Sequence, residues 1–542
     1  MSSRMTGGEA IVESLLQHGV DTVFAIPGVQ TYGLFDALQR AGDRIRVVGA
    51  RHEQACAYMA FGYARTTARA GVFSVVPGPG VLNAAAGICS AYGASTPTLC
   101  LTGQIPSRHI GAGKGLLHEL PDQLATLRTL TKWAERIEHP SLAPALVAEA
   151  FAQMHSGRPR PVALEMPMDV FTMTAPVAPL PPRAPAPPPE VDGQRLDDAA
   201  RLLRDARQPM IMVGSGAQAA HAEVLELAEL LQAPVVAWRG GRGVVADDHP
   251  LGMTCAAGFE RWADTDVLLG IGSRLELHWQ RWPNTPRALK IVNIDIDPAQ
   301  VRRIAPDVAL VADARAATRL LIDALRRDTP PRPSRQREFE AVKAATAARA
   351  AKVQPHMDYL AAMRRVLPRD GFFVEEICQA GFTSHFGFPV YTPRSFVACG
   401  HQGTLGFGYA TSLGVKIAHP DKAVVSISGD GGFMFGVQEL ATAVQYGIGV
   451  VAVVFNNHAY GNVRRDQQQR FGGRVIGADL VNPDFVRLAE SFGMAGRRVA
   501  SPAALQAALE RALGEGAPAL IEVEVDLASE ASPWEFLTPP PR

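Results

Sequence analysis

Two clusters of glycine and polar residues constrain the fold of this chain most, because each directly follows an apolar run. Gly429-Asp430-Gly431 comes after the run at 423–428, and Asn456-Asn457 comes after the run at 449–455. Both runs have the length and β-branched content of buried parallel strands, and residues 435–446 between them carry apolar side chains at helical intervals. A strand, a glycine turn, a helix and a second strand predict a βαβ unit.

The residues of this unit have the chemistry of a site for a diphosphate and a divalent metal ion. Glycines let a backbone approach a diphosphate closely, and the N-terminus of the following helix offers free N–H groups to the anion. Asp430 and Asn457 supply the hard oxygen donors that Mg²⁺ prefers. The sequence Gly-Asp-Gly alone also suits a plain tight turn, but the paired asparagines after the next strand favour the metal and diphosphate site.

The segment GDGGFMFGVQELATAVQYGIGVVAVVFNN resembles the cofactor motif of thiamine diphosphate enzymes, specifically the acetolactate synthase-like group. The resemblance implies that the diphosphate of thiamine diphosphate lies against Gly429, Gly431 and Gly432. It also implies a bound Mg²⁺ ion, whose protein ligands are the side chains of Asp430 and Asn457 and the main-chain carbonyl of Ala459.

The composition excludes several classes of partner. The 542 residues include 53 lysines and arginines and 53 aspartates and glutamates, so no charge imbalance indicates nucleic acid or an anionic membrane. No stretch approaches the roughly 20 apolar residues of a membrane span, and the N-terminus lacks the apolar core of a signal peptide. Six scattered cysteines suit reduced thiols better than a zinc site or a disulfide framework. We therefore expect a cytoplasmic enzyme with a small-molecule substrate.

Two composition shifts divide the chain. The proline-rich segment 176–190 excludes a regular helix or central strand, and 326–355 favours an exposed connecting helix after its first prolines. Elsewhere apolar runs alternate with amphipathic helical patterns, which predicts parallel α/β sheets throughout. The resemblance covers nearly the whole chain. It implies three α/β domains, each with a mainly parallel sheet flanked by helices: a pyrimidine-binding domain (1–175), a Rossmann-like middle domain (191–325) and a diphosphate-binding domain (356–542).

Glu53 lies where an apolar run meets a helical pattern, in RHEQACAYMAFGYAR. From composition alone it is an acid in the first turn of a helix, stabilised by the helix dipole by up to about 1 kcal/mol. The segment resembles the signature around the activating glutamate of the family. That resemblance implies a buried carboxylate that hydrogen-bonds the aminopyrimidine ring of the cofactor, and burial raises the pKa of such a carboxyl group.

Two more glycine-rich segments are expected beside the cofactor. Residues 77–80 (PGPG) lead from an apolar run into a small-residue helix, and residues 400–408 precede the metal motif. Ordinary turns and close helix packing would explain these glycines, and Leu405 has the alternative of a core leucine. The resemblance instead implies a pocket lined by Pro79, Gly80 and Asn83. It also implies that Leu405 supports the bent cofactor, whose amino group donates to the carbonyl of Gly403.

The substrate-side residues depart from those of acetolactate synthases. Those enzymes usually carry Phe-Gln-Glu where this chain has Leu117-His118-Glu119, and GLLHELPDQ is closer to guanidino-oxo-acid decarboxylases of the same group. His118 suits a proton donor near neutral pH, with a structural histidine as the alternative. Gln30, in the loop IPGVQ, can hydrogen-bond a substrate but is no strong base. Glu53, His118 and Gln30 are therefore our catalytic candidates.

In the middle segment, the turn GSGAQA after residues 210–213 is a weak dinucleotide-type signal. Some members of the family hold a non-redox FAD there. Residues 276–282 depart from the FAD-binding pattern, so the resemblance permits FAD without favouring it.

Three hypotheses for function follow. The first is a Mg²⁺- and thiamine diphosphate-dependent lyase or transferase that decarboxylates a 2-oxo acid, with optional ligation to a second carbonyl compound. The second is a non-ligating decarboxylase of a longer, polar 2-oxo acid of the guanidino type. The third is a cofactor-binding protein without catalysis. The resemblance also implies a homodimer or homotetramer, because it places Glu53 and the Asp430 site of each centre on different subunits.

Overall fold

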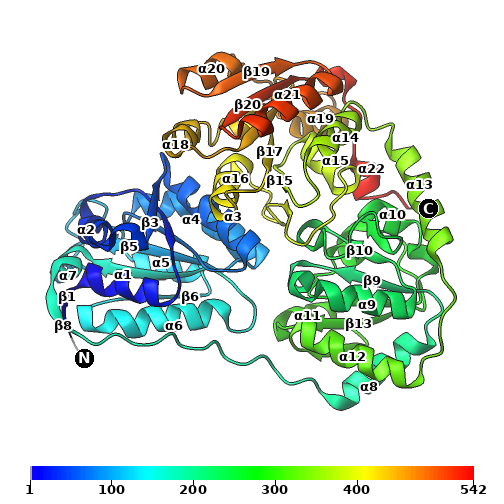
Figure 1. Cartoon of the computed structure of the whole chain (residues 1–542), viewed down its shortest axis with the longest axis horizontal. Coiled ribbons are helices and arrows are strands. Elements are labelled where there is room, and N and C mark those ends of the chain that lie inside the picture. The colour runs from blue at the N-terminus through cyan, green and yellow to red at the C-terminus, as the bar shows by residue number, and fades with distance from the viewer. Residues whose placement is uncertain (1–2, 542) are drawn as a thin grey trace.

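The computed structural model describes residues 3–541 and contains three six-stranded sheets, one in each domain. All strand pairs within these three sheets are parallel. Figure 1 shows the N-terminal domain in blue and cyan, the middle domain in green and the C-terminal domain in yellow to red. This confirms the predicted fold class. Among residues 3–541, no helix has both the length and the apolar character needed to cross a membrane.

The N-terminal sheet has the strand order β3-β2-β4-β5-β7-β6. Its strands are β2 (Thr22–Ala25), β3 (Arg46–Gly49), β4 (Gly71–Val75), β5 (Thr98–Gln104), β6 (Trp133–Arg136) and β7 (Val162–Pro167). Its helices are α1 (Gly7–Gln17), α2 (Tyr32–Ala41), α3 (Glu53–Thr67), α4 (Pro79–Ala94), α5 (Gln123–Leu130), α6 (Ala143–His155) and α7 (Met168–Thr172). An antiparallel ribbon of β1 (Ser3–Thr6) and β8 (Thr174–Val177) lies at its edge.

The C-terminal sheet repeats the N-terminal topology, with the order β16-β15-β17-β18-β20-β19. Its strands are β15 (Phe372–Val374), β16 (Phe396–Val397), β17 (Val424–Gly429), β18 (Val451–Asn456), β19 (Ala495–Val499) and β20 (Ala519–Glu524). The helices are α14 (His356–Val366), α15 (Gln379–Gly387), α16 (Phe407–Ala418), α17 (Asp430–Phe433), α18 (Glu439–Tyr446), α19 (Gly461–Arg470), α20 (Phe485–Ser491), α21 (Pro502–Glu515) and α22 (Trp534–Leu537). In both domains the second strand lies outside the first, so the strand order reverses between the first and third strands.

The middle sheet has the different order β11-β10-β9-β12-β13-β14, which is the Rossmann order 3-2-1-4-5-6 within the domain. Its strands are β9 (Pro209–Val213), β10 (Val235–Ala237), β11 (Gly252–Thr254), β12 (Val267–Ile271), β13 (Lys290–Asp295) and β14 (Val308–Val311). Its helices are α8 (Gly193–Asp205), α9 (His221–Leu231), α10 (Cys255–Phe259), α11 (Pro298–Ile304) and α12 (Ala314–Asp328).

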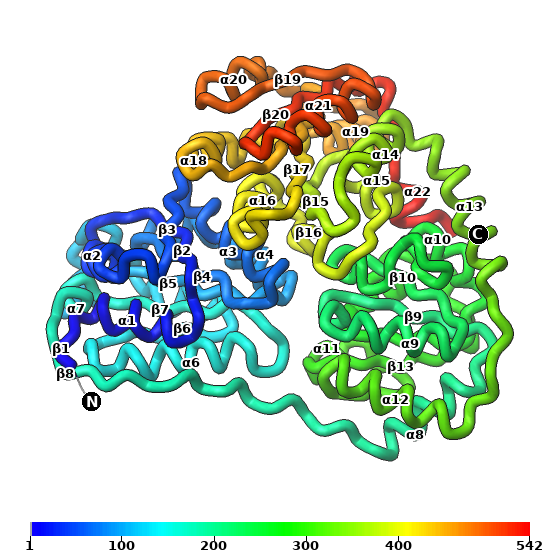
Figure 2. Tube along the Cα trace, viewed as in Figure 1, coloured from blue at the N-terminus to red at the C-terminus, as the bar shows by residue number. Residues whose placement is uncertain are grey.

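The two connecting segments differ in character. Residues 178–192 contain no helix or strand, and Figure 2 shows this stretch running beneath the molecule from β8 to α8. The second connection contains α13 (Gln336–Ala350), as the composition indicated. Most positions of α13 are exposed, as expected, but Phe339 and Ala350 on its inner side are buried. Phe339 belongs to the core of the middle domain, so α13 packs on that domain.

Helices α3 and α16 join the N-terminal and C-terminal domains by very close packing. A side chain at Gly62 would lie 2.2 Å from the Thr411 carbonyl oxygen, and one at Gly414 would lie 2.0 Å from the Met59 carbonyl oxygen. Only glycine fits at these two positions. The small residues of AFGYAR therefore fix the position of the helix that begins at Glu53.

One predicted helix was too long. The structure divides residues 430–446 into α17 and α18, with turns at 434–438 instead of a helix from residue 435. The N–H groups of Phe435 and Gly436 donate to the carbonyl oxygens three residues earlier, as in tight turns. Helical spacing of apolar residues did not reveal this interruption.

Candidate active site

Asp430 and Asn457 follow adjacent strands of the C-terminal sheet, beside the point where its strand order reverses. Asp430 opens α17 directly after β17, and Asn457 follows β18. Open α/β sheets bind ligands at such reversal points, beyond the carboxyl ends of the strands. Asp430 is only 2% exposed, and its burial raises the pKa of its carboxyl group. The amide of Asn482 opposes this rise by donating to Asp430 Oδ2 at 2.7 Å.

The side chain of Asn457 is also held in place. Its Nδ2 donates to both carboxylate oxygens of Glu530 at 3.1 Å, and its Oδ1 accepts from the N–H of Ala459 at 3.1 Å. Glu530 accepts a further hydrogen bond, of 3.0 Å, from Nε2 of the buried His356. Ala459 forms a short antiparallel bridge with Asp479. The loop that carries two expected metal ligands is therefore ordered by contacts from distant segments.

These donors fit Mg²⁺ better than a soft metal. Asp430 offers a carboxylate, Asn457 an amide oxygen and Ala459 a main-chain carbonyl, which are all hard oxygen atoms. Among residues 3–541, no cluster of three or more His, Cys, Asp or Glu side chains is arranged to hold a metal ion. A Mg²⁺ ion here would complete its coordination with diphosphate oxygens and water, as this ion commonly does.

The glycines after β17 leave room that a side chain would fill. A Cβ at Gly432 would lie 2.1 Å from Glu376 Oε1, and one at Gly431 would lie 2.4 Å from Cε1 of Tyr460. At Gly429 a Cβ would meet Cβ of Cys378 at 3.0 Å. A backbone without side chains at this turn suits the close approach of a diphosphate.

Glu376 is a buried carboxylate beneath this turn, just beyond the end of β15. It is fully buried and accepts hydrogen bonds of 2.9 Å from the N–H groups of Gly406 and Gly408 and from the Ser428 hydroxyl. Burial raises its pKa to about 7, and the three hydrogen bonds oppose that rise. Glu376 thus ties the loop before α16 to the strand before Asp430.

Leu405 and Gly403 lie in that loop. Leu405 is partly exposed rather than part of the core, and one of its methyl groups lies 3.4 Å from the place of a Cβ at Gly432. Gly403 has a φ of 59°, in the left-handed region that favours glycine. Thr404 between them accepts a hydrogen bond of 3.0 Å from the Tyr58 hydroxyl of α3. Leu405 therefore borders the glycine turn after β17, where a cofactor would contact it.

Glu53 is the first residue of α3, in the N-terminal domain. Its carboxylate accepts a hydrogen bond of 3.0 Å from Nδ2 of Asn83, which lies in the first turns of α4. The resemblance implied a buried carboxylate, but in a single chain Glu53 is partly exposed. Within residues 3–541, no hydrogen bond or ion pair joins Glu53 to Asp430 or Asn457.

The PGPG segment forms the turn between β4 and α4. Pro79 is the exposed first residue of α4 and Gly80 is buried behind it. Gly78 has a φ of 61°, and its N–H donates to Oε1 of the buried Gln123 at 2.8 Å. This turn lies at the reversal point of the N-terminal sheet, the equivalent of the Asp430 site in the other domain.

Gln30 and His118 meet beside this turn. Gln30 Oε1 lies 2.9 Å from His118 Nδ1, and Gln30 Nε2 donates to the Leu117 carbonyl oxygen at 2.9 Å. His118 has a φ of 66°, which is uncommon for a residue other than glycine. The structure therefore brings Gln30 and His118 together, next to the turn that precedes Asn83.

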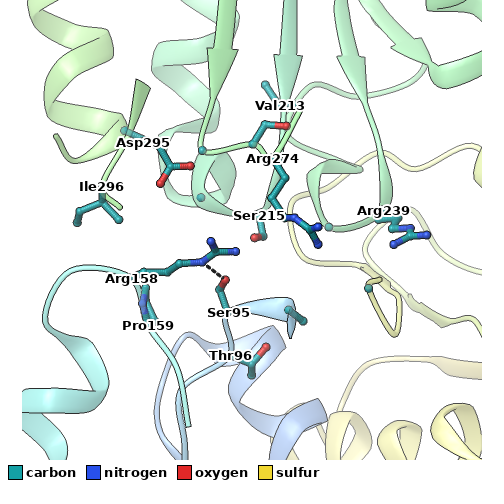
Figure 3. Close-up of a pocket in the computed structure, with 18 of the residues that line it drawn as sticks. Ser95, Thr96, Arg158, Pro159, Val213, Ser215, Arg239, Arg274, Asp295 and Ile296 are labelled. Atoms are coloured by element: carbon teal, nitrogen blue, oxygen red, sulfur yellow. Dashed lines mark hydrogen bonds between the residues drawn. The ribbon is translucent and has the colours of Figure 1, made fainter. Parts of the chain in front are cut away.

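A cavity of about 400 Å³ lies apart from these residues, where all three domains meet. It is lined by the glycine turns after β9 and β12, and Figure 3 shows Arg158 of the N-terminal domain approaching them. Arg158 donates to Ser95 Oγ at 2.7 Å. Burial raises the pKa of Asp295, at the end of β13, to about 6. The cavity occupies the reversal point of the middle sheet, between β9 and β12.

The candidate site has two parts, called half-sites below: the surroundings of Asp430 in the C-terminal domain and those of the PGPG turn in the N-terminal domain. The sequence analysis missed four side chains that order them: Glu376, Asn482, Glu530 and Gln123. Glu376 lies 30 residues before its partner Gly406, and Asn482 and Glu530 lie 52 and 73 residues beyond theirs. No local spacing marks such residues. The one signal available was the placement of Glu376 just after an apolar run, the position that Asp430 has after the next strand of the sheet.

Comparison with protein families matches all three domains. Residues 5–126 match the N-terminal thiamine pyrophosphate-binding domain of thiamine pyrophosphate enzymes, and residues 376–523 match their C-terminal thiamine pyrophosphate-binding domain. Residues 196–321 match the central domain of the same enzymes. Thiamine pyrophosphate is another name for thiamine diphosphate, so the matches agree with the cofactor that the glycine motif indicated.

Curated relatives match over almost the full length. A probable 2-ketoarginine decarboxylase of Pseudomonas aeruginosa is 35% identical over 96% of this chain and 94% of its own. A probable acetolactate synthase large subunit of Methanocaldococcus jannaschii is 34% identical over 98% and 93%. An acetolactate synthase of Arthrospira platensis is 32% identical over 98% and 96%. The chain therefore belongs to the thiamine pyrophosphate enzymes, in their acetolactate synthase-like group.

Proposed function

We propose that this enzyme uses thiamine diphosphate and Mg²⁺ to decarboxylate a 2-oxo acid and releases the product as an aldehyde. The observation that carries the proposal is the pairing of His118 with Gln30. By the resemblance, Leu117-His118 stands where acetolactate synthases have Phe-Gln. A histidine there can protonate the carbon that has lost CO₂ before a second carbonyl compound adds to it. The bound cofactor supplies the electron sink for the cleavage of the carbon–carbon bond.

The chain's own residues divide the remaining work. Asp430, Asn457 and the Ala459 carbonyl would hold the metal ion, and the glycine turn from Gly429 to Gly432 would receive the diphosphate. Glu53 would hydrogen-bond the pyrimidine ring, with Asn83 holding its carboxylate. Leu405 would support the bent shape of the cofactor.

We propose a longer, polar 2-oxo acid as the substrate. The similarity to a probable 2-ketoarginine decarboxylase supports this class, as does GLLHELPDQ in the N-terminal domain. The second candidate function is ligation of the decarboxylated fragment to another 2-oxo acid, which the similarity to acetolactate synthases favours. The relatives are named as synthases and a decarboxylase, which supports catalysis over a silent binding protein.

A panel of 2-oxo acids separates these functions. The protein is incubated with thiamine diphosphate, Mg²⁺ and pyruvate, a branched 2-oxo acid or a guanidino 2-oxo acid, and CO₂ and organic products are quantified. We expect CO₂ and an aldehyde in equal amounts from the guanidino acid, with little 2-hydroxyketone. Chiefly 2-hydroxyketone from pyruvate would favour ligation instead. Failure to accelerate hydrogen exchange at C2 of the cofactor would contradict both functions.

We also propose that two copies of the chain complete each active centre, as a homodimer or a dimer of dimers. Exposed apolar side chains occur close along the chain to the residues of both half-sites, and exposed apolar surface is typical of interfaces. In the N-terminal domain these are Val29, Tyr32, Leu82 and Leu117. In the C-terminal domain they are Met434, Phe435, Val463, Phe471, Ile476 and Val481. A two-fold pairing would bury both sets and would bring Glu53 of one copy to the Asp430 site of the other.

For the cavity between the three domains we propose a nucleotide ligand. Arg274 reaches this cavity after β12, and burial lowers the pKa of its guanidinium group, so a phosphate would compensate its charge. FAD belongs to this ligand class. The small molecules released from the purified, denatured protein are identified by absorbance and mass spectrometry. We expect an adenine nucleotide that Arg274→Ala protein lacks. Finding none, with no thermal stabilisation by added FAD or ADP, would contradict the proposal.

We propose a cytoplasmic location for the enzyme. All six cysteines are free, which agrees with a reducing compartment.

A further inference from the structure

The amide of Gln30 is held in one orientation. Gln30 is 2% exposed, and a Cβ at Gly103 would lie 2.5 Å from the main-chain carbonyl oxygen of Gln30 and 2.9 Å from its Cβ, so Gly103 fixes the position from which this side chain starts. Gln30 Nε2 donates to the Leu117 carbonyl oxygen at 2.9 Å. The reversed amide would place two acceptor oxygens against each other, so Oε1 must face the other way, toward His118.

This orientation determines where His118 carries its proton. Nδ1 of His118 lies 2.9 Å from Gln30 Oε1, and an amide oxygen only accepts hydrogen bonds. Nδ1 must therefore be the donor, whether the ring is neutral or charged. In the neutral ring Nε2 is then free of a proton and can accept one, because the hydrogen bond at one ring nitrogen sets the state of the other.

The backbone of His118 is also fixed before any substrate binds. Its φ of 66° is a strained conformation, of the kind that persists where the surrounding structure enforces it. A Cβ at Gly78 would lie 2.6 Å from the His118 carbonyl oxygen, so the turn after β4 packs directly on it. That turn is held by Gln123, which donates to the Gly103 carbonyl oxygen at 3.0 Å and to the buried Glu165 at 2.8 Å.

We propose that Gln30 is a positioning residue that fixes the Nδ1–H tautomer of His118, and that Nε2 of His118 is the atom that delivers the proton to the product. This inference rests on the proposed decarboxylation. In the step, the Nε2–H bond of the charged ring breaks and a C–H bond forms at the carbon that has lost CO₂. The electron pair stays on Nε2, the neutral ring keeps its proton on Nδ1 against Gln30, and water returns a proton to Nε2. One proton enters for each CO₂ released.

The tautomer is measured directly by NMR on protein labelled with ¹⁵N-histidine, without cofactor or substrate, at about pH 8.5, roughly two units above the usual imidazole pKa. The His118 signals are identified by their loss in His118→Gln protein. We expect wild-type His118 to show the Nδ1–H form alone. Gln30→Met should show both tautomers. Gln30→Glu loses the donor to the Leu117 carbonyl but retains an acceptor oxygen for Nδ1, and should keep the Nδ1–H form. The surface variant Gln39→Met serves as the matched control.

An Nε2–H tautomer in the wild type, or an unchanged Nδ1–H tautomer in Gln30→Met, would overturn the inference even if the enzyme decarboxylates 2-oxo acids. In kinetics with an accepted 2-oxo acid, Gln30→Met should lower kcat for aldehyde release by about 10–100-fold with a smaller change in KM, since general acids contribute about 10²–10⁴-fold. An equal loss in Gln30→Glu and Gln30→Met would assign Gln30 to substrate binding instead. Because the NMR result needs no turnover, failure of the proposed function is distinguishable from failure of this inference.

Discussion

Glu376 lies beneath the glycine turn and connects it to the Leu405 loop. Its two carboxylate oxygens accept hydrogen bonds from two main-chain N–H groups and from Ser428. A glutamine at this position has one acceptor oxygen, so buried donors would lose their partners, at about 1–3 kcal/mol each. Glu376 therefore holds together two segments that border the candidate cofactor site.

We predict that Glu376→Gln lowers the free energy of unfolding by about 2–4 kcal/mol and weakens thiamine diphosphate binding. Urea unfolding and a fluorescence titration with the cofactor measure the two effects. The matched control is Glu340→Gln, at an exposed position of α13, which should change stability by less than about 0.5 kcal/mol. Equal stability and affinity in Glu376→Gln and wild type would contradict the positioning role.

Glu375 gives a prediction about pH. Burial raises its pKa from the ordinary 4.5 to about 7, against the opposing effects of the Arg239 charge and of hydrogen bonds from the main chain and the thiol of Cys399. The folded state binds this proton more tightly than the unfolded state. The contribution of Glu375 to the free energy of unfolding is therefore greatest below about pH 4.5 and falls as the pH rises toward 7. Above that range the charged carboxylate is buried at a cost of the order of 3 kcal/mol at most.

We therefore expect Glu375→Gln protein without cofactor to gain melting temperature relative to wild type as pH rises from about 5 to about 8. Differential scanning fluorimetry of both proteins at each pH measures the difference in their melting temperatures. Groups that titrate in both proteins affect both melting temperatures equally and cancel in this difference. A difference in melting temperature that does not change with pH would contradict the raised pKa of Glu375.

At the scale of elements, the turn between β17 and α17 depends on glycine for space. An alanine at Gly432 would place its Cβ 2.1 Å from Glu376 Oε1, whereas one at Gly436 would meet its nearest atom, the Gly406 carbonyl oxygen, at 3.8 Å. We expect Gly432→Ala to lower stability by about 1–3 kcal/mol and to abolish cofactor binding. Gly436→Ala is the matched control and should retain both. Isothermal titration calorimetry with thiamine diphosphate and Mg²⁺ measures the binding. Equal binding by the two variants would contradict the proposal that the turn from Gly429 to Gly432 receives the diphosphate.

The elements also show what the sequence could predict. Strand β17 was predicted to within one residue, because buried parallel strands are short, continuous apolar runs between turn residues. Asp430 and Asn457 could be placed together because both directly follow adjacent strands. The division into α17 and α18 could not be predicted, since apolar spacing continues across the turns at 434–438. Asn482 and Glu530 were not found because their partners lie more than 50 residues away.

The sequence also could not predict the pairing of Gln30 with His118. These residues lie 88 positions apart: Gln30 follows β2, and His118 lies in the segment after β5, which β4 separates from β2 in the sheet. The motif GLLHELPDQ identified His118 as a candidate, and IPGVQ identified Gln30, but neither pattern carries information about the other. The strained φ of His118 is likewise visible only in the folded chain.

At the scale of the whole molecule, the exposed apolar residues beside the two half-sites predict association. Leu82 precedes Asn83 on α4 and is half exposed in a single chain. Burying a leucine contributes about 1.5–3 kcal/mol, and a two-fold interface would contain it twice. We expect Leu82→Ser to raise the dissociation constant of the dimer by at least ~100-fold, as measured by analytical ultracentrifugation. Leu320→Ser, at an exposed position of α12 far along the chain from both half-sites, is the control. Equal association of both variants and wild type would contradict this interface.

The central claim is that Glu53 of one copy and Asp430 of another form one thiamine diphosphate centre. Glu53→Gln and Asp430→Asn chains are co-expressed with different affinity tags, and hybrid oligomers are purified on both tags. CO₂ release from an accepted 2-oxo acid is then compared with that of each variant alone. Each variant alone should be inactive, whereas a hybrid dimer retains one intact centre of two and should show about half the wild-type rate. An inactive hybrid beside inactive single variants would contradict the shared centre.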